Sequence, residues 1–517
     1  MFIDKGYNGE QIKPGMIPSS ITHLSFNDNF YSLIQVGSLP DSLTKLKLGN
    51  GFNQPIDGIF DHLTSLVSLR LGSGFNHTII PGHLPQSLTR LKIGPCSTPL
   101  RHEPGALPPA LTILLNGHVS ATQSLPMTIT HLSFQSYFNN IIEPGMLPMM
   151  LTTLQFGQYY NKGLLPDAIP SSVTSIVFGD YFNCVLHPKV LPNALTSLRF
   201  GTLYDKSIPT HILPASLRFL EFGLNFNRPL THGTFPSNSQ LHTLIFGDQF
   251  KCQFEPDVLP MSLTKLKFAY FYNQEWLPGS FPSSLLWLHT GEWFNKEVVE
   301  VGFPPALTDL TLGSCFNKRI KKKSLPQSIT RLTIGAGFNK PLTLRHLPSS
   351  LTELISNKKY LQIAMYPKHI DLRLSPGPGP GLDQSPRSPT PTPTPSPPHQ
   401  RLVNKIKKLQ LQVSMFTKVD EFMDQMFEMI PEVEMYEVVY HHAALPEYIH
   451  NLRLLDNDRS FGICCSTYVG PSPEQHLQQH QSITNVMFFN RKDLKLLRYT
   501  LLDLATYKSK PKPMFQA

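Results

Sequence analysis

Apolar and polar residues alternate in short stretches along this chain, and the stretches recur about every 22 residues. In residues 263–268 the alternation places Leu266 and Phe268 on one face and Lys265 and Lys267 on the other, which is typical of a half-buried strand. Eleven of the fifteen intervals between equivalent apolar positions are 22 residues long, a regularity that chance does not sustain. The sixteen positions where we expect a strand to begin are Ile21, Leu43, Leu66, Leu88, Leu111, Ile129, Leu151, Val173, Leu195, Leu217, Leu241, Leu263, Leu285, Leu307, Ile329 and Leu351.

A single unit of this length cannot bury its own apolar face, whereas stacked units bury a continuous core. The sequence therefore predicts a repeat solenoid over residues 1–360, in which the strands of successive turns pair in parallel. Proline precedes many strands, as at Pro85 and Pro260, where it stiffens the turn without breaking the sheet. After the strand we expect glycine to adopt positive φ, phenylalanine to stack as a spine, and asparagine to bond the backbone of the next turn.

Each unit ends in Gly-x-x-Phe-Asn, as in residues 72–76, 179–183, 223–227, 313–317 and 335–339. These units closely resemble FNIP repeats, which are best known from social amoebae and are regarded as relatives of leucine-rich repeats. The resemblance covers residues 1 to about 355 and implies a curved, leucine-rich-repeat-like solenoid of the α/β type with about 16 turns. It also implies a binding scaffold. Some FNIP proteins carry an F-box, so a substrate-recognition subunit of a ubiquitin ligase is the alternative, although no F-box is visible in the sequence.

Two irregularities interrupt the period. The chain opens inside a repeat, so we expect the array either to begin abruptly or to continue upstream. The interval from Leu111 to Ile129 is only 18 residues, and the unit around residues 117–123 lacks its Phe-Asn. A kink in the superhelix is expected there.

Residues 375–400 are rich in proline, serine and threonine, a composition that cannot form a core and predicts an extended or disordered linker. The segment offers PxxP-like ligands and proline-directed phosphorylation sites, and its phosphates could fold back onto a basic surface of the array. A passive spacer is the alternative. The phosphorylation candidates are Ser375, Ser385, Ser388, Thr390, Thr392, Thr394 and Ser396.

Residues 401–517 are predicted to form a small α+β module of no recognised family, which could carry an activity of its own. Leucine, isoleucine, valine and phenylalanine follow a four-three spacing over residues 402–416, which favours a helix packed within the module. A second amphipathic helix is predicted over residues 490–506.

The positive charge is concentrated on one face of the predicted strands. The chain carries a formal net charge of +9, and residues 1–374 hold 30 Lys or Arg against 22 Asp or Glu, a net of +8. The two outward positions of each strand account for nine of these cations and three of the acids, so this face carries +6. A solvated polar face is one interpretation, and a concave patch for an acidic protein partner is the other, with nucleic acid a further alternative. The predicted patch consists of Lys45, Lys47, Arg70, Arg90, Lys92, Arg199, Lys265 and Lys267.

No motif indicates catalysis or a cofactor: the sequence has no GxxxxGK[ST], no GxGxxG and no kinase catalytic loop. The histidines of residues 441–480 and the pair Cys464 and Cys465 match no known metal-binding spacing, so no metal site is predicted. The six cysteines form no CxxC pair and are expected to be free, buried thiols. No apolar stretch approaches the roughly 20 residues of a membrane span, and no signal region opens the chain, which favours the cytoplasm.

Overall fold

The computed structural model describes residues 2–3, 11–94, 101–117, 125–299, 302–335, 337–340 and 346–357, together with the strands of residues 371–375, 409–414, 435–442, 445–454, 461–469 and 483–490. The chain divides into two compact units, Met1–Leu285 and Leu286–Ala517. Each unit contains a parallel β-solenoid whose strands pair in register with those of the adjacent turns. The predicted solenoid is therefore confirmed within each unit.

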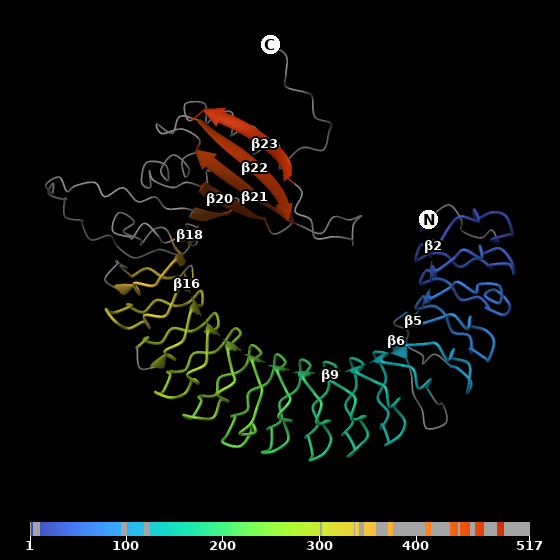
Figure 1. Ribbon diagram of the computed structural model, residues 1–517, viewed down its shortest axis with the longest axis horizontal. Coiled ribbons are helices and arrows are strands. Elements are labelled where there is room, and N and C mark those ends of the chain that lie inside the picture. The colour runs from blue at the N-terminus through green and yellow to red at the C-terminus, as the bar shows by residue number, and fades with distance from the viewer. Residues whose placement is uncertain are drawn as a thin grey trace, which may run out of the picture. The chain divides into compact units, whose positions relative to one another are not determined.

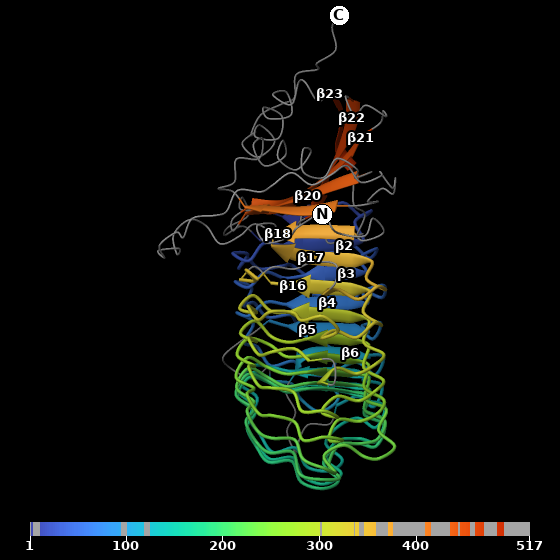
Figure 2. The same cartoon turned by 90° about the vertical axis from the view of Figure 1, so that its left-hand side faces the viewer.

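Short strands one turn apart build the first unit, and each pairs in parallel with the next (Figure 2). They begin about two residues later than predicted. Leu263 precedes its strand because its backbone N–H donates to the Pro260 carbonyl at 3.0 Å and so belongs to the proline turn. The strands are β1 (Phe2–Ile3), β2 (His23–Phe26), β3 (Lys45–Lys47), β4 (Ser68–Leu71), β5 (Arg90–Ile93), β6 (Ile113–Gly117), β7 (His131–Phe134), β8 (Thr153–Gln155), β9 (Ser175–Val177), β10 (Ser197–Arg199), β11 (Phe219–Glu221), β12 (Thr243–Ile245) and β13 (Lys265–Lys267).

The second unit continues the repeat and then changes its pairing. From β14 to β20 each strand pairs in parallel with the next one. From β20 to β23 each strand pairs with the next one in the antiparallel direction. β19 is a strand where the spacing predicted a helix, so that prediction is wrong for residues 409–414, while the helix predicted after Asn490 lies outside the described residues. The strands are β14 (Trp287–His289), β15 (Asp309–Leu312), β16 (Arg331–Ile334), β17 (Glu353–Asn357), β18 (Asp371–Ser375), β19 (Leu409–Ser414), β20 (Met435–His442), β21 (Leu445–Leu454), β22 (Phe461–Val469) and β23 (Ile483–Asn490).

In the first unit the turns form a curved stack, and their strands line its concave side (Figure 1). Burial alternates along most of these strands, as the sequence predicted, with β6 and β7 as exceptions. Leu266 and Phe268 are fully buried, whereas Lys265 and Lys267 are exposed on the opposite face. The outward strand positions therefore make up the concave face of this unit.

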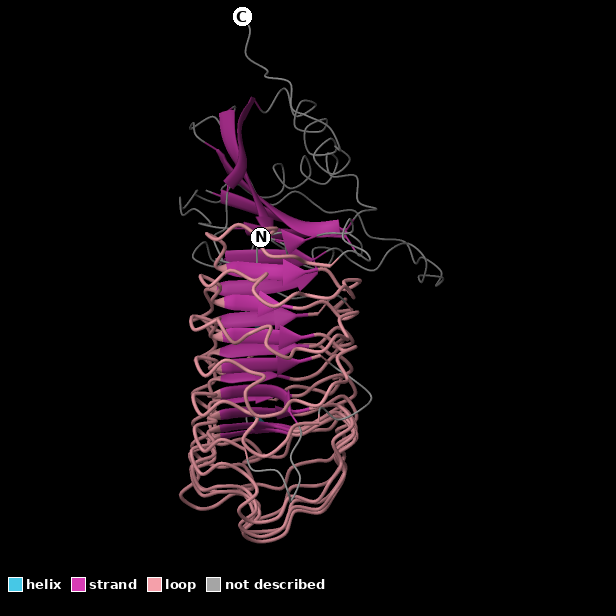
Figure 3. Cartoon of the chain, turned by 90° about the vertical axis from the view of Figure 1, so that its right-hand side faces the viewer, coloured by secondary structure: helices cyan, strands magenta, loops and turns pink. Residues whose placement is uncertain are grey.

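Loops and turns, not helices, complete each turn in the described part of the solenoid (Figure 3). The α/β-type prediction is wrong in this respect. Proline locks φ and removes a backbone donor, and the chain contains 48 prolines, many of them in the segments between strands. Such segments form consecutive tight turns instead of a helix. At the short repeat, the β6–β7 pairing shifts register between Leu115 and Gly117.

Two rows of aromatic rings run through the core of the first unit. One row contains the predicted spine, in which Phe182 stacks between Tyr160 and Tyr204 at centroid distances of 6.1 and 5.9 Å. The other row comes from the residue directly after each of β8 to β13, as in Phe178 and Phe200 at 5.5 Å. The rings of one turn also stack on each other, so each aromatic side chain is held from several sides.

At most turns of the first unit the glycine after the strand is required by close packing of the backbone, and not by the predicted positive φ, which Gly291 after β14 does adopt. A Cβ atom on Gly72 would lie 2.0 Å from the carbonyl oxygen of Gly49 in the preceding turn. Positive φ occurs instead at Pro-Gly turns, as at Gly145 and Gly279. The recurring glycine thus sets how closely consecutive turns approach.

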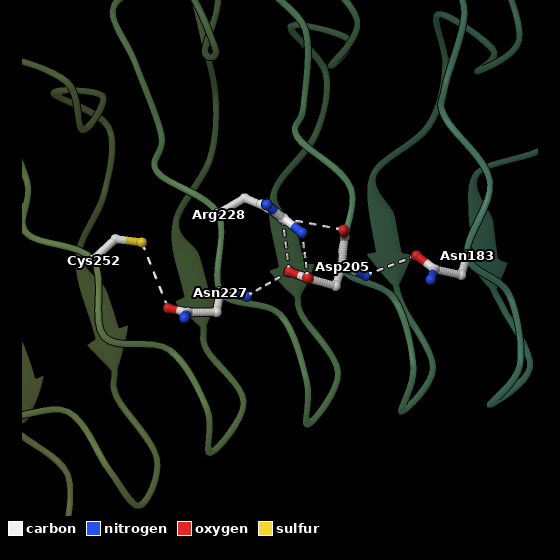
Figure 4. A network of polar contacts seen from close by, with 5 residues as sticks. All are labelled: Asn183, Asp205, Asn227, Arg228 and Cys252. Atoms are coloured by element: carbon white, nitrogen blue, oxygen red, sulfur yellow. Dashed lines mark hydrogen bonds and ion pairs between the residues drawn. The ribbon is translucent and has the colours of Figure 1, made fainter.

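The recurring asparagine forms a ladder between turns, as predicted. The Asn161 side-chain oxygen accepts from the backbone N–H of Asn183 at 3.0 Å, and Asn183 accepts in turn from the N–H of Asp205. Asp205 replaces asparagine at one rung, where it accepts from the N–H of Asn227 and binds Arg228 at 2.7 Å (Figure 4). The ladder is structural, since every one of these acceptors satisfies a backbone donor.

Candidate binding face on strands β3 to β5

The outward residues of β3, β4 and β5 lie in two straight columns because the three strands pair without a register shift. In the first column Lys45 lies opposite Ser68, and Ser68 lies opposite Arg90. In the second column Lys47, Arg70 and Lys92 follow one another. We call these six positions the basic grid: Lys45, Lys47, Ser68, Arg70, Arg90 and Lys92.

Packing fixes the side of the sheet on which the basic grid lies. The residue between the two columns is leucine in each strand, and Leu46, Leu69 and Leu91 are buried. Since successive strand residues point to opposite faces, the grid residues project from the concave face. Lys45 and Arg90 are exposed, and the side chains of the second column are half-buried.

The cations of the grid have few partners. Within the described residues the grid forms one ion pair, between Lys47 Nζ and Asp28 Oδ1 at 3.9 Å, and both side chains are partly exposed. A pair this long and this exposed contributes little. Arg70 Nε is buried and finds no hydrogen-bond acceptor in the described part of the chain. The grid therefore holds five positive charges of which one is weakly paired.

The grid ends abruptly on both sides. On β6, Ile113 pairs with Arg90 and Leu115 pairs with Lys92, so two apolar residues follow the last cations. We call Ile113 and Leu115 the apolar step. On β2, Ser25 pairs with Lys47 and His23 pairs with Lys45, so no lysine or arginine continues either column. The basic surface is therefore three strands wide.

The other three residues of the predicted patch lie elsewhere on the unit. Arg199 on β10 binds Glu221 at 3.2 Å, and its guanidinium lies 4.9 Å from the ring centroid of Phe219. Lys265 and Lys267 are exposed on β13. The structure thus brings the five cations of β3 to β5 together, out of the eight predicted residues. Arg199 is paired with an acid, and the two lysines of β13 lie apart from the grid.

Sequence reasoning missed two features. Asp28 lies in the turn after β2, outside the strand columns, so no alternation could have paired it with Lys47. The densest run of cations in the chain lies in a turn before β16, off the strand face, where Lys321 binds Glu297 at 2.8 Å. A count of Lys and Arg along the sequence would have found it. Its members are Lys318, Arg319, Lys321, Lys322 and Lys323.

Tyrosine hydroxyls and cysteine thiols supply no second site in the described part of the chain. The hydroxyls of Tyr160 and Tyr204 are buried without a partner in the described residues, and burial raises the pKa of both. The cysteines of the described turns are free, as predicted, but not buried: Cys184 and Cys252 are half-buried and Cys315 is exposed. Burial also raises the pKa of the Cys184 and Cys252 thiols, which keeps them in the less reactive protonated form.

Most of the remaining residues considered as sites lie outside the described part of the chain. Ser375 ends β18, and the other phosphorylation candidates lie outside the described residues. The side chains of Cys464 and Cys465 on β22 are likewise not described. Among the described residues no three or more His, Cys, Asp or Glu gather as metal ligands would. The described part of the chain also contains no helix long and apolar enough to span a membrane.

The parallel strands, inward leucines and outward polar columns define a leucine-rich-repeat-like β-solenoid. The chain belongs to the FNIP repeat family, whose model matches residues 7–51, 33–74, 121–159, 160–203, 204–240, 226–271 and 316–358. The resemblance found in the sequence is thereby confirmed.

The crystal structure of CroV588, described as "a novel circular LRR protein structure", is similar to this chain. The two are 30% identical, with a TM-score of 0.61, over 79% of this chain and 68% of that one. The pneumococcal vaccine antigen PcpA is 13% identical, with a TM-score of 0.17 and coverage of 71% and 77%. A leucine-rich repeat protein from Bacteroides ovatus ATCC 8483 is 12% identical, with a TM-score of 0.13 and coverage of 70% and 86%. No curated protein matches the sequence.

Proposed function

We propose that this protein is a non-enzymatic scaffold that binds an acidic protein partner on the concave face of its first unit, with the basic grid as the main contact. The observation that carries the proposal is the cluster of five cations on three paired strands with one long ion pair. Repeat solenoids present extended concave surfaces that suit protein partners.

The charges themselves favour such a partner. Neighbouring strands are about 4.8 Å apart, so the cations of the second column are attached to the sheet side by side. Like charges about 4 Å apart repel by about 1 kcal/mol even in bulk water. Repulsion between cations of the grid is therefore present in the free protein and is relieved when carboxylates approach. Arg199 shows the opposite situation, since Glu221 of the next strand already neutralises it.

Two alternatives stay predictions. A substrate-recognition role in a ubiquitin ligase depends on an F-box, which the sequence does not show. An activity in residues 401–517 depends on side chains outside the described residues. We place the protein in the cytoplasm as part of the same proposal.

Titration of the full-length chain with fluorescein-labelled poly-glutamate, at increasing sodium chloride, tests the acidic-partner proposal. We expect binding at low salt that weakens steadily as salt rises. Serine at all five cationic grid positions should weaken binding at least about tenfold, a loss of about 1.4 kcal/mol. Equal binding by this variant would contradict the proposal.

A control variant removes the same number of positive charges outside the strand face. Serine at these five positions should leave poly-glutamate binding within about twofold of the wild type if the grid is the site. An equal loss in both variants would mean that net charge, and not the grid, attracts the probe. The control positions are Lys318, Arg319, Lys321, Lys322 and Lys323.

A further inference from the structure

The basic grid has a short side chain at its centre. Ser68 lies between Lys45 and Arg90 in the first column, and Arg70 lies two residues further along the same strand. The strand spacing of about 4.8 Å and the rise of about 3.3 Å per residue place all three cations within reach of one point above Ser68. The long neighbours and the short serine form a notch with cationic walls.

We propose that this notch binds the phosphoryl group of a phosphorylated protein segment. The inference rests on the proposed function and specifies the chemistry of the partner. A phosphoryl group carries a charge of about −1.5 to −2 and offers three acceptor oxygens. Lys45 and Arg90 supply cationic donors from either side, Arg70 supplies a planar fork, and the Ser68 hydroxyl supplies a donor below.

Phosphoryl chemistry fits this group of donors better than a single carboxylate does. A carboxylate brings one charge and two oxygens to a site with three surrounding cations. Arginine binds phosphate through two parallel N–H bonds, and such charge-assisted bonds are about twice as strong as neutral ones.

The width of the grid argues for one phosphoryl group and against a nucleic acid. Three strands extend about 10 Å across the sheet, and a nucleic acid backbone is bound by a groove that follows many phosphates. The cations stop at β6, where Ile113 and Leu115 replace them. A continuing polyanion would therefore meet apolar side chains.

The apolar step adds a specificity element. Ser68 on β4 and Ile113 on β6 are two strand spacings apart, about 10 Å, which an extended peptide covers in about three residues. A bound segment should therefore carry an apolar residue three positions from the phosphorylated one.

This chain contains a sequence of that kind and so supplies a probe. Leu382 lies three positions before Ser385, a Ser-Pro site, and Asp383 lies between them. A synthetic peptide of residues 380–390, phosphorylated at Ser385 and labelled with fluorescein, would be titrated with the full-length unphosphorylated chain. Fluorescence anisotropy reports its affinity at low salt.

We expect the phosphorylated peptide to bind at least about tenfold more tightly than the unmodified peptide, because charge-assisted hydrogen bonds contribute more than neutral ones. It should also bind at least about tenfold more tightly than a Ser385→Glu peptide, because a phosphoryl group carries more charge and one more acceptor oxygen than a carboxylate. Ser68→Asp, which places a carboxylate in the notch, should abolish the difference. The matched control is Ser197→Asp, because β10 repeats the Ser-Leu-Arg of β4 without flanking cations. This control should bind like the wild type.

A conservative variant keeps the test informative if Ser68→Asp folds poorly. Arg70→Lys retains the charge and removes the planar guanidinium, so binding of the phosphorylated peptide should fall several-fold while poly-glutamate binding changes little.

Equal binding of the phosphorylated and glutamate peptides would overturn the phosphoryl site and leave the acidic-partner proposal standing. Tighter binding of a single-stranded oligonucleotide of equal charge would overturn the phosphoprotein assignment. The acidic-partner proposal fails separately, if the five-site variant still binds poly-glutamate.

Discussion

Strands β4 and β10 both begin with Ser-Leu-Arg, at the same place in the repeat. On β4, Ser68 lies between two cations and Arg70 continues a column of cations. On β10, Ser197 lies between Ser175 and Phe219, and Arg199 is bound by Glu221. Identical residues therefore form a charged notch in one turn and a neutralised surface in another.

The difference between the two turns lies entirely in the neighbouring strands. Because each strand is paired in register, a residue 22 or 23 positions away is the closest neighbour on the same face. The scaffold repeats every turn, whereas the chemistry of the concave face depends on which two or three turns stand side by side. The binding properties of such a solenoid thus depend on the outward residues of several adjacent strands, and not on the sequence of a single repeat.

The largest effect should be the same in both turns. Leu69 and Leu198 occupy the inward position of β4 and β10, and both are fully buried. Leu69→Ala and Leu198→Ala should each lower the free energy of unfolding by about 2–5 kcal/mol, because each leaves a cavity in a packed core. Urea unfolding followed by circular dichroism measures the loss. A loss below about 1 kcal/mol at either position would mean that the inward faces of the two turns are not equivalent.

A smaller effect should distinguish the two turns. The spine residue after β4 is Phe75, whereas the equivalent residue after β10 is Tyr204, whose buried hydroxyl has no partner in the described residues. Tyr204→Phe removes an unsatisfied polar group and should raise the free energy of unfolding by about 1 kcal/mol. Phe75→Tyr should lower it. A destabilised Tyr204→Phe variant would show that the hydroxyl has a partner.

The same variant should change the response to alkaline pH. Burial raises the pKa of Tyr204 above its ordinary value of 10.0, so the folded protein retains this proton more strongly than the unfolded chain. The resulting stability is complete below the ordinary pKa and is lost as the pH rises above about 10. Tyr204→Phe should make the decline in unfolding temperature above pH 10 shallower. An unchanged decline would argue against the burial of this hydroxyl.

The smallest effect concerns the ion pair of β10. Glu221→Gln leaves Arg199 without its carboxylate partner, and exposed pairs of this kind contribute about 0.2–1 kcal/mol. The unfolding temperature should therefore change little. Binding of poly-glutamate should strengthen up to a few-fold as Arg199 becomes available. A weaker affinity after Glu221→Gln would contradict the view that Glu221 masks a cation.

Hydrophobic periodicity was sufficient to predict the repeated scaffold. Leu266 and Phe268 were assigned to the core, and Lys265 and Lys267 to the open face, from alternation alone, and both assignments are confirmed. The aromatic spine and the asparagine ladder followed from residue chemistry repeated at one period. These features involve residues of one turn or equivalent residues of adjacent turns. A pattern that repeats along the sequence is therefore enough to predict them.

Features that depend on backbone approach or on neighbouring elements were not predictable. Gly72 has no side chain because the Gly49 carbonyl lies against it, and no local pattern reveals that contact. The prolines between strands formed turns where the comparison with leucine-rich repeats suggested helices. A four-three spacing over residues 402–416 was consistent with a helix, yet residues 409–414 join a sheet.

The candidate site was partly predictable for the same reason. The cluster of Lys45, Lys47, Arg70, Arg90 and Lys92 follows from the strand phase, since consecutive turns lie side by side. The partners of Arg199 and Lys47 come from Glu221 on the next strand and from Asp28 in a turn. The pair of Arg199 and Glu221 could have been inferred, because the two residues are neighbours on adjacent strands. The pair of Lys47 and Asp28 could not, because it depends on the path of the turn that contains Asp28.

A matched pair of double variants tests the central claim, that the grid binds acidic partners because of its arrangement. Lys45→Ser with Arg90→Ser removes two charges from the grid, and Lys265→Ser with Lys267→Ser removes two exposed charges from the concave face of β13. Both are titrated with labelled poly-glutamate at low salt. We predict that the grid variant binds at least about tenfold more weakly than the wild type and that the β13 variant stays within about twofold. Equal losses in the two variants would contradict the account.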